Sequence, residues 1–128
     1  MKVIHTDTAP QAIGTYSQAI EVGNTVYLSG QIPLDPQTML LCSTDIVEQI
    51  HQVFKNILAI VNAACGHLHQ IVKLTVYLTD LSHFPHVNDV MARYFTEPYP
   101  ARVAIGVSAL PKNALVEIDA MLVKESNA

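Results

Sequence analysis

The amino-acid sequence predicts a two-layer α+β fold, in which two helices cover one face of a mixed β-sheet. Two segments have the apolar spacing of amphipathic helices, and five shorter segments have strand-like patterns between turn residues. They follow one another in the order β-β-α-β-α-β-β, without repeats or an internal linker. Because 128 residues is an ordinary domain length, we expect residues 1–128 to form a single domain.

The more regular helix is predicted over residues 45–64. Apolar residues recur there at steps of three and four, which places them on one side of a helix. Asp45 is suited to cap the first turn, and Gly66 is suited to end the helix. A second helix is predicted over residues 83–95, with Ser82 as its N-cap. The expected buried faces are Ile46, Ile50, Val53, Ile57 and Ile60 in the first helix, and Phe84, Val87, Met91 and Tyr94 in the second.

The predicted strands are shorter and are separated by turn-forming residues. Gly23-Asn24 links the first two strands, and both residues tolerate the positive φ angles of a two-residue hairpin. Residues 30–43 contain Pro33 and Pro36 and are predicted to form a loop. Strands are predicted over residues 16–22, 25–29, 72–78, 102–107 and 115–123, with 3–5 as a further short candidate.

Alternation along the last two predicted strands indicates which side chains share a face of the sheet. If the apolar sets of both strands pack on the helices, Arg102 and Glu117 lie together on the far face. That face then also carries Leu115, Met121 and Val123, which are too apolar to stay in water. A second subunit covering it would dehydrate the two charges and create a pocket with a strong local field. The inward sets are Val103, Ile105 and Val107 in one strand and Val116, Ile118, Ala120 and Leu122 in the other, which leaves Ala104, Gly106 and Asp119 outward.

The composition indicates that subunits associate. Half of the residues are hydrophobic and 14% are charged, whereas ordinary soluble domains carry about 25% charged residues. We therefore expect an apolar surface to be buried against other subunits. No apolar stretch approaches the ~20 residues that span a bilayer, and the N-terminal residues lack a signal-peptide pattern. We expect a cytoplasmic protein without membrane partners, in which Cys42 and Cys65 are reduced thiols.

The charge and the motifs of the sequence argue against a nucleic-acid partner, a bound metal and a bound cofactor. The net charge is −4 and the seven Lys and Arg residues are scattered, so we expect no basic patch and no nucleic-acid partner. The pairs His67/His69 and His83/His86 lack the suitably spaced Cys, Asp or Glu of a zinc site. No phosphate-binding glycine loop or nucleophile elbow is present, so we expect neither a metal nor a cofactor.

Four polar side chains are candidates for chemistry. The Arg102 guanidinium can hold a carboxylate by two parallel hydrogen bonds, and the Glu117 carboxylate can position or deprotonate a water. Tyr16 and Ser29 each offer a hydroxyl on the first hairpin. On pattern alone, a structural role is the more common one for each. The structural alternatives are a surface ion pair for Arg102 and Glu117, packing for Tyr16 and a turn for Ser29.

The C-terminal part of the chain resembles the signature of the RidA/YjgF family, in PARVAIGVSALP at residues 100–111 and VEI at residues 116–118. The resemblance covers nearly the whole chain in order. Its other segments are APQAIG at 9–14, YSQA at 16–19, LSGQIP at 28–33, TVYLTD at 75–80 and VN at 87–88.

This resemblance implies a chorismate-mutase-like fold assembled as a homotrimeric barrel, with three sites in the clefts between subunits. It also implies a 2-iminobutanoate/2-iminopropanoate deaminase, which hydrolyses reactive 2-enamino and 2-imino acids such as 2-aminoacrylate and 2-iminobutanoate. The products are 2-oxo acids and ammonia, and no cofactor is needed. By position, Arg102 would hold the substrate carboxylate, Glu117 would position the water, Tyr16, Ser29 and Ala104 would line the pocket, and Asn88 would give structural support.

Two positions depart from the family pattern. Thr15 stands where a proline often precedes the tyrosine, which loosens the loop that carries Tyr16. Ala104 stands where many members have a cysteine, but this position contributes mainly through its backbone, so deaminase chemistry is expected to persist. Two alternatives remain open: a module that binds small carboxylates without turning them over, and a chaperone-like or nucleic-acid-acting protein of the same fold.

Overall fold

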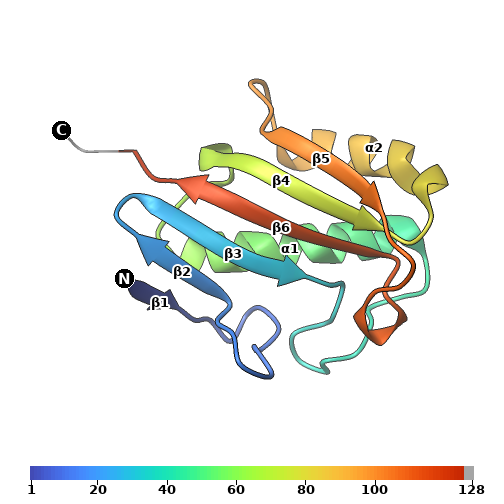
Figure 1. The fold of residues 1–128 in the computed structure, drawn as a ribbon, viewed down its shortest axis with the longest axis horizontal. Coiled ribbons are helices and arrows are strands. Elements are labelled where there is room, and N and C mark those ends of the chain that lie inside the picture. The colour runs from blue at the N-terminus through green and yellow to red at the C-terminus, as the bar shows by residue number, and fades with distance from the viewer. Residues whose placement is uncertain (126–128) are drawn as a thin grey trace.

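The chain forms one six-stranded mixed sheet with both α-helices on the same face (Figure 1). The structure is a computed structural model, and it describes residues 1–125. This arrangement confirms the predicted two-layer α+β fold. The elements are β1 (Lys2–Ile4), β2 (Ala19–Val22), β3 (Thr25–Gln31), α1 (Ile46–Ala63), β4 (Ile71–Leu78), α2 (Phe84–Tyr94), β5 (Ala101–Gly106) and β6 (Val116–Val123).

The strand order is β1-β2-β3-β6-β4-β5, so the last strand of the chain lies inside the sheet. Strands β4 and β5 are parallel and are connected through α2, whereas all other neighbours are antiparallel. The β2–β3 hairpin turns at Gly23, which has the predicted positive φ, 58°. Because β5 is an edge strand, one side of its backbone is open to another molecule.

Helix α1 begins as predicted but ends differently. Oδ2 of Asp45 accepts a hydrogen bond of 3.0 Å from the backbone N–H of Glu48, which is the expected N-cap contact. At the other end, Cys65 rather than Gly66 has a left-handed φ, 60°. Gly66 lies where space is tight, since a Cβ there would lie 3.1 Å from Cδ1 of Leu122. Neither α1 nor α2, the α-helices of residues 1–125, is long and apolar enough to cross a membrane.

The start of α2 corrects the predicted cap. His83, not Ser82, is the N-cap residue, and a short 3-10 turn (η2, Leu81–His83) precedes the helix. Oδ1 of Asp80 accepts a hydrogen bond of 2.9 Å from the backbone N–H of Ser82 and so caps this turn. Asp80 and Ser82 can both act as caps. The charged Asp80 is the stronger acceptor, so the helical turns begin after Asp80, earlier than the sequence suggested.

The core lies between the sheet and the two helices. Val116, Ile118 and Leu122 of β6 have no exposed surface, which confirms the inward set predicted for this strand. Phe54 of α1 makes an edge-to-face contact with Phe95, directly after α2, with 5.7 Å between the ring centroids. This packing holds both helices against the strands that carry the candidate site residues.

Strand β5 presents the opposite face from the one predicted. Its register with the buried residues of β4 places Arg102 and Ala104 on the helix side of the sheet. Val103 and Ile105 therefore lie on the open side, where each is 41% exposed. Space is tight on the helix side only at the end of β5, where a Cβ added to Gly106 would lie 3.1 Å from a side chain of η2. Alternation showed correctly which residues share a face, but not which face packs on the helices.

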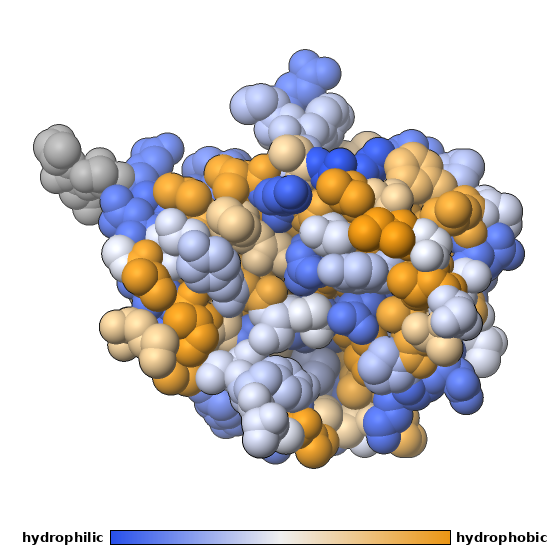
Figure 2. All heavy atoms as spheres, viewed as in Figure 1, coloured by the Kyte–Doolittle hydropathy of each residue, from blue (hydrophilic) through white to orange (hydrophobic). Residues whose placement is uncertain are grey.

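The open face of the sheet carries many apolar residues, as the sequence predicted, together with polar and charged ones. Figure 2 shows this face, with apolar residues spread over the strands and a hollow near its centre. Leu115 is an exception to the prediction, because it precedes β6 and packs against the core. Apolar surface of this kind is typical of an interface. The large apolar residues exposed on these strands are Val3, Val22, Tyr27, Val72, Val103, Ile105 and Val123.

Candidate functional site

Helix α2 holds the guanidinium of Arg102. Nη1 donates hydrogen bonds to Oδ1 of Asn88 at 2.6 Å and to Sδ of Met91 at 3.4 Å. Cζ lies 4.6 Å from the ring centroid of Phe84, within the range of a cation–π contact. Residues 84, 88 and 91 recur at steps of four and three, so one face of α2 makes all three contacts.

A cavity of about 390 Å³ opens beside Arg102. Among the contacts described within residues 1–125, Nη1 makes both hydrogen bonds, so Nε and Nη2 remain to donate in parallel to a carboxylate. Arg102 is half-buried, and partial shielding from water strengthens such a pair. The cavity is lined by Asn88, Met91, Ala92, Tyr99, Pro100 and Arg102.

Glu117 lies on the open face of β6 and is half-buried. Burial raises the pKa of its carboxyl group, and the nearby negative charge of Asp119 raises it further. The backbone of Gly30 in β3 approaches so closely that a Cβ at this position would clash with the Glu117 carboxylate. A carboxylate with a raised pKa is a stronger base than an ordinary glutamate, which suits it to deprotonate a water.

Tyr77 and Asp119 stand beside Glu117 on the same face. Tyr77 and Glu117 are Cα partners across β4 and β6, and the Tyr77 hydroxyl donates a hydrogen bond of 3.0 Å to Oδ2 of Asp119. This hydrogen bond is the main reason why the pKa of Tyr77 is raised. The sequence placed Asp119 on this face, and its spacing of two residues from Glu117 was the available signal that the two carboxylates are neighbours.

Ser29 and Tyr16 lie at the end of the sheet near Gly30. The Ser29 hydroxyl donates a hydrogen bond of 2.5 Å to the carbonyl of Ser17, so it holds the segment that follows Tyr16. Tyr16 is 53% exposed, and together with Gly30 it lines a hollow of about 60 Å³. Ser29 therefore has a structural contact in this chain, and its oxygen can still accept a hydrogen bond from a ligand.

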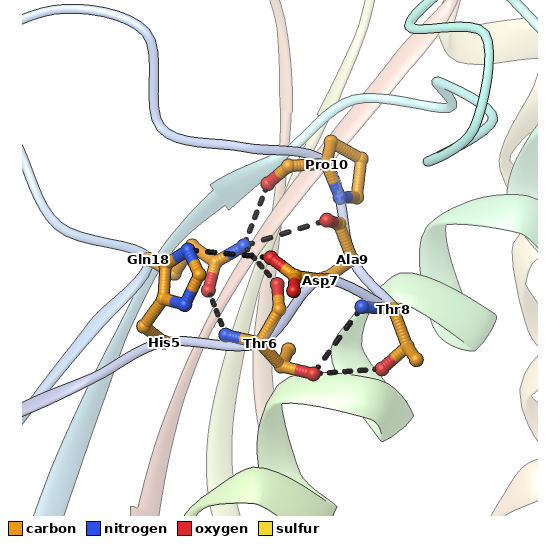
Figure 3. A network of polar contacts seen from close by, with 7 residues as sticks. All are labelled: His5, Thr6, Asp7, Thr8, Ala9, Pro10 and Gln18. Carbon is orange, nitrogen blue, oxygen red and sulfur yellow. Dashed lines mark hydrogen bonds and ion pairs between the residues drawn. The ribbon is translucent and has the colours of Figure 1, made fainter.

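Gln18 anchors the loop that carries Tyr16, as Figure 3 shows. Its Nε2 donates to the carbonyl of Pro10 at 2.8 Å and to that of Thr6 at 3.0 Å, while its Oε1 accepts from the Thr6 backbone N–H at 2.8 Å. The side chain is 2% exposed, so these hydrogen bonds are shielded from water. The position of Tyr16 is thus set at both ends of the loop, and Gln18 has a structural role that the sequence did not reveal.

The predicted meeting of Arg102 and Glu117 on one face is wrong. Arg102 and Ala104 lie on the helix side of β5, whereas Glu117 lies on the open side of β6 with Ser29 and Tyr16 at the same end of the sheet. Strand β4 separates the two strands, and a register offset of three residues puts the Cα atoms of Arg102 and Glu117 roughly 14 Å apart. The candidate residues of one chain therefore form two separate groups that face different ways.

Similarity to known proteins extends over almost the whole chain. The family model described as Endoribonuclease L-PSP matches residues 6–124. A Mus musculus protein named 2-iminobutanoate/2-iminopropanoate deaminase is 45% identical over 123 residues, which cover 96% of this chain and 91% of that protein.

Two solved structures are also similar. The crystal structure of RidA from the Antarctic bacterium Psychrobacter sp. matches with a TM-score of 0.93 and 53% identity, covering 96% of this chain and 99% of that one. The crystal structure of E. coli TdcF with bound serine matches with a TM-score of 0.93 and 40% identity, covering 98% and 100%. The chain belongs to the RidA/YjgF family, whose family model carries the description Endoribonuclease L-PSP.

Proposed function

We propose that this protein is a 2-iminobutanoate/2-iminopropanoate deaminase, which hydrolyses 2-imino and 2-enamino acids to 2-oxo acids and ammonia. The observation that carries the proposal is the Arg102 guanidinium, held by Asn88, Met91 and Phe84 at the wall of a cavity of about 390 Å³. A guanidinium held in this way suits the carboxylate that all these substrates share. The 45% identical relative named as such a deaminase supports the same reaction.

We propose that the working enzyme is a homotrimer and that each site combines residues of two subunits. Arg102 and Glu117 of one chain lie on opposite faces of the sheet, so a substrate held by Arg102 needs the Glu117 of another chain. The apolar open face, with Val103 and Ile105 exposed, is the surface that such an assembly would bury. The open backbone edge of β5, next to Arg102 and Ala104, faces the cleft between subunits in this arrangement.

The reaction needs no group beyond these side chains. The enamine first tautomerises to the imine, and Arg102 holds the carboxylate so that the C=N carbon faces a water at Glu117. Glu117 takes a proton as the water oxygen bonds to this carbon, and the C=N electron pair moves to the nitrogen, which takes a proton from solvent. Glu117 then gives its proton to the amino group of the carbinolamine, the C–N bond breaks and ammonia leaves, and the hydroxyl group loses its proton to solvent as C=O forms. General-base catalysis contributes typically 10²–10⁴-fold, which suffices for an imine that hydrolyses unaided.

The test generates the unstable substrate within the assay mixture. Threonine and a threonine dehydratase generate 2-iminobutanoate, and semicarbazide traps whatever survives. We expect the wild-type protein to suppress the trapped adduct and Arg102→Ala to lose roughly 100-fold or more of this activity, because two charge-assisted hydrogen bonds disappear. Arg93→Ala, which removes the other arginine of the chain, is the matched control and should behave as wild type.

Three outcomes would contradict the proposal. Near-native suppression by Arg102→Ala would remove the carboxylate-binding role of Arg102. Binding of a 2-oxo acid without any suppression by the wild type would favour a small-carboxylate-binding module. A wild-type protein that neither binds a 2-oxo acid nor suppresses the adduct, but prevents a client protein from aggregating, would favour a chaperone-like role.

A further inference from the structure

The Tyr77–Asp119 pair has no part in the reaction as proposed above, yet it lies directly beside Glu117. Tyr77 is the Cα partner of Glu117 across β4 and β6, and its side chain reaches past that residue to Asp119. The hydroxyl donates to Oδ2 of Asp119 at 3.0 Å, which orients the aspartate carboxylate on the open face. A neighbouring strand thus holds a second carboxylate next to the proposed base.

The strand fixes the spacing of the two residues that carry these carboxylates. Glu117 and Asp119 are two residues apart on one face of β6, which corresponds to a Cα separation of roughly 7 Å. On the β3 side, the Glu117 carboxylate occupies the place that a Cβ on Gly30 would take. Two like charges held this close in a partly dehydrated place repel each other, and repulsion favours uptake of a proton by Glu117.

Other ionisable groups share this face of the sheet. Lys73 and Tyr77 face it from β4, Tyr27 faces it from β3, and the loop before β2 brings Tyr16 near Gly30. Lys73 pairs with Met121, four residues along β6 from Glu117, so it lies nearer to Asp119 than to Glu117. The residues of β5 on this face are Ala101, Val103 and Ile105, which carry no charge.

We propose that Asp119, oriented by the Tyr77 hydroxyl, is a positioning residue whose negative charge makes Glu117 a stronger base towards the attacking water. The inference rests on the proposed function, and it adds a residue that increases the basicity of Glu117. A stronger base removes a proton from water more readily, and the benefit lasts as long as the base stays largely ionised at working pH. The Tyr77 hydroxyl is needed because a carboxylate without it can rotate away from Glu117.

The experiment compares Asp119→Asn and Tyr77→Phe with wild type, and uses Asp7→Asn as a matched control. Asp7 is an exposed aspartate of the N-terminal segment, so its variant also removes one negative charge. Two quantities are measured for each protein: the titration of the Glu117 carboxyl by ¹³C NMR, assigned with Glu117→Gln, and the pH profile of kcat/KM for a 2-imino acid. Light scattering confirms that each variant keeps the wild-type assembly.

For Asp119→Asn we expect the Glu117 titration to move to lower pH and the acid limb of kcat/KM to follow it. At neutral pH kcat should fall roughly two- to tenfold with little change in KM, a small part of what a general base contributes. Tyr77→Phe should shift both quantities in the same direction by less, and Asp7→Asn should shift neither.

An unchanged Glu117 titration in Asp119→Asn would overturn the inference, as would a titration that moves while the acid limb stays in place. Wild-type protein without turnover would overturn the proposed function and the role of Asp119 with it. The two failures are distinguishable, because failure of the inference alone leaves wild-type turnover intact.

Discussion

Nη1 of Arg102 and Oδ1 of Asn88 are joined by a hydrogen bond of 2.6 Å, which ties an arginine of the edge strand to helix α2. Asn88 therefore orients the guanidinium and does not itself need to touch the substrate. We expect Asn88→Ala to lower kcat/KM about tenfold, mainly through a higher KM, because a hydrogen bond to a charged group is lost. Steady-state kinetics on the generated imine check this, with Asp89→Ala as the neighbouring control. An unchanged KM would show that α2 does not orient Arg102 through Asn88.

Gly30→Ala tests the close approach of β3 to Glu117. The added Cβ would clash with the Glu117 carboxylate, so the carboxylate must leave its position. We expect turnover to fall roughly tenfold or more while the protein still folds at a cost of about 1–3 kcal/mol. Gly23→Ala is the control: its Cβ meets nothing within 4 Å, but its φ of 58° strains an alanine. That variant should lose stability and keep its turnover, and equal losses of turnover in both would contradict the account.

The ionised Glu117 carboxylate should lower the stability of the folded state at neutral pH. Burial raises the pKa of its carboxyl group above the unfolded value, so the folded state binds the proton more tightly. Its contribution to stability is therefore greatest below the unfolded pKa and is lost as the pH rises through the folded pKa. We expect Glu117→Gln to raise Tm at pH 7 and to bring no gain at low pH, measured at one protein concentration. A lower Tm at pH 7 would contradict this.

The same shift predicts the pH dependence of the reaction. Glu117 acts as a base only when it is ionised, so kcat/KM should fall as the pH drops through its raised pKa. The acid limb of the profile should lie above the range of an ordinary glutamate and should be missing in the residual activity of Glu117→Gln. An acid limb that survives this substitution would assign it to another group.

Val103→Asp tests the role of the open face. Val103 lies on that face and is 41% exposed in the single chain. A charge buried there without a partner opposes association, so we expect a smaller particle by light scattering and a loss of most activity, although Arg102 and Glu117 are intact. Active protein of unchanged size would show that subunits do not associate through this face.

Local patterns predicted most of the fold. The apolar spacing of α1, the cap at Asp45 and the inward set of β6 were correct because each depends on neighbours in sequence. The face of β5 was wrong because its inward side depends on what packs there. Val103 and Ile105 are apolar and yet lie on the surface of the single chain, where another subunit would cover them in the proposed assembly. The strand pattern alone does not distinguish that surface from the core.

The candidate site could be predicted only in part. The sequence named Arg102 and Glu117, and the family resemblance named Asn88 as a support, but the contacts of Phe84 with Arg102 and of Tyr77 with Asp119 come from distant segments that the pattern did not connect to the site. The spacing of Phe84 and Asn88 along α2 fits an ordinary buried helix face equally well. Which residues meet across strands depends on the sheet order, and no short-range pattern contains that order.

The most direct test of a site shared between subunits mixes two variants that each have little activity alone. Arg102→Ala and Glu117→Gln chains carry different tags, are produced together, and are purified on both tags so that every assembly contains both chains. If each site takes Arg102 from one subunit and Glu117 from the next, every mixed trimer holds one intact site of three, and about one third of wild-type activity should return. Activity no higher than that of either variant alone would contradict a site shared between subunits.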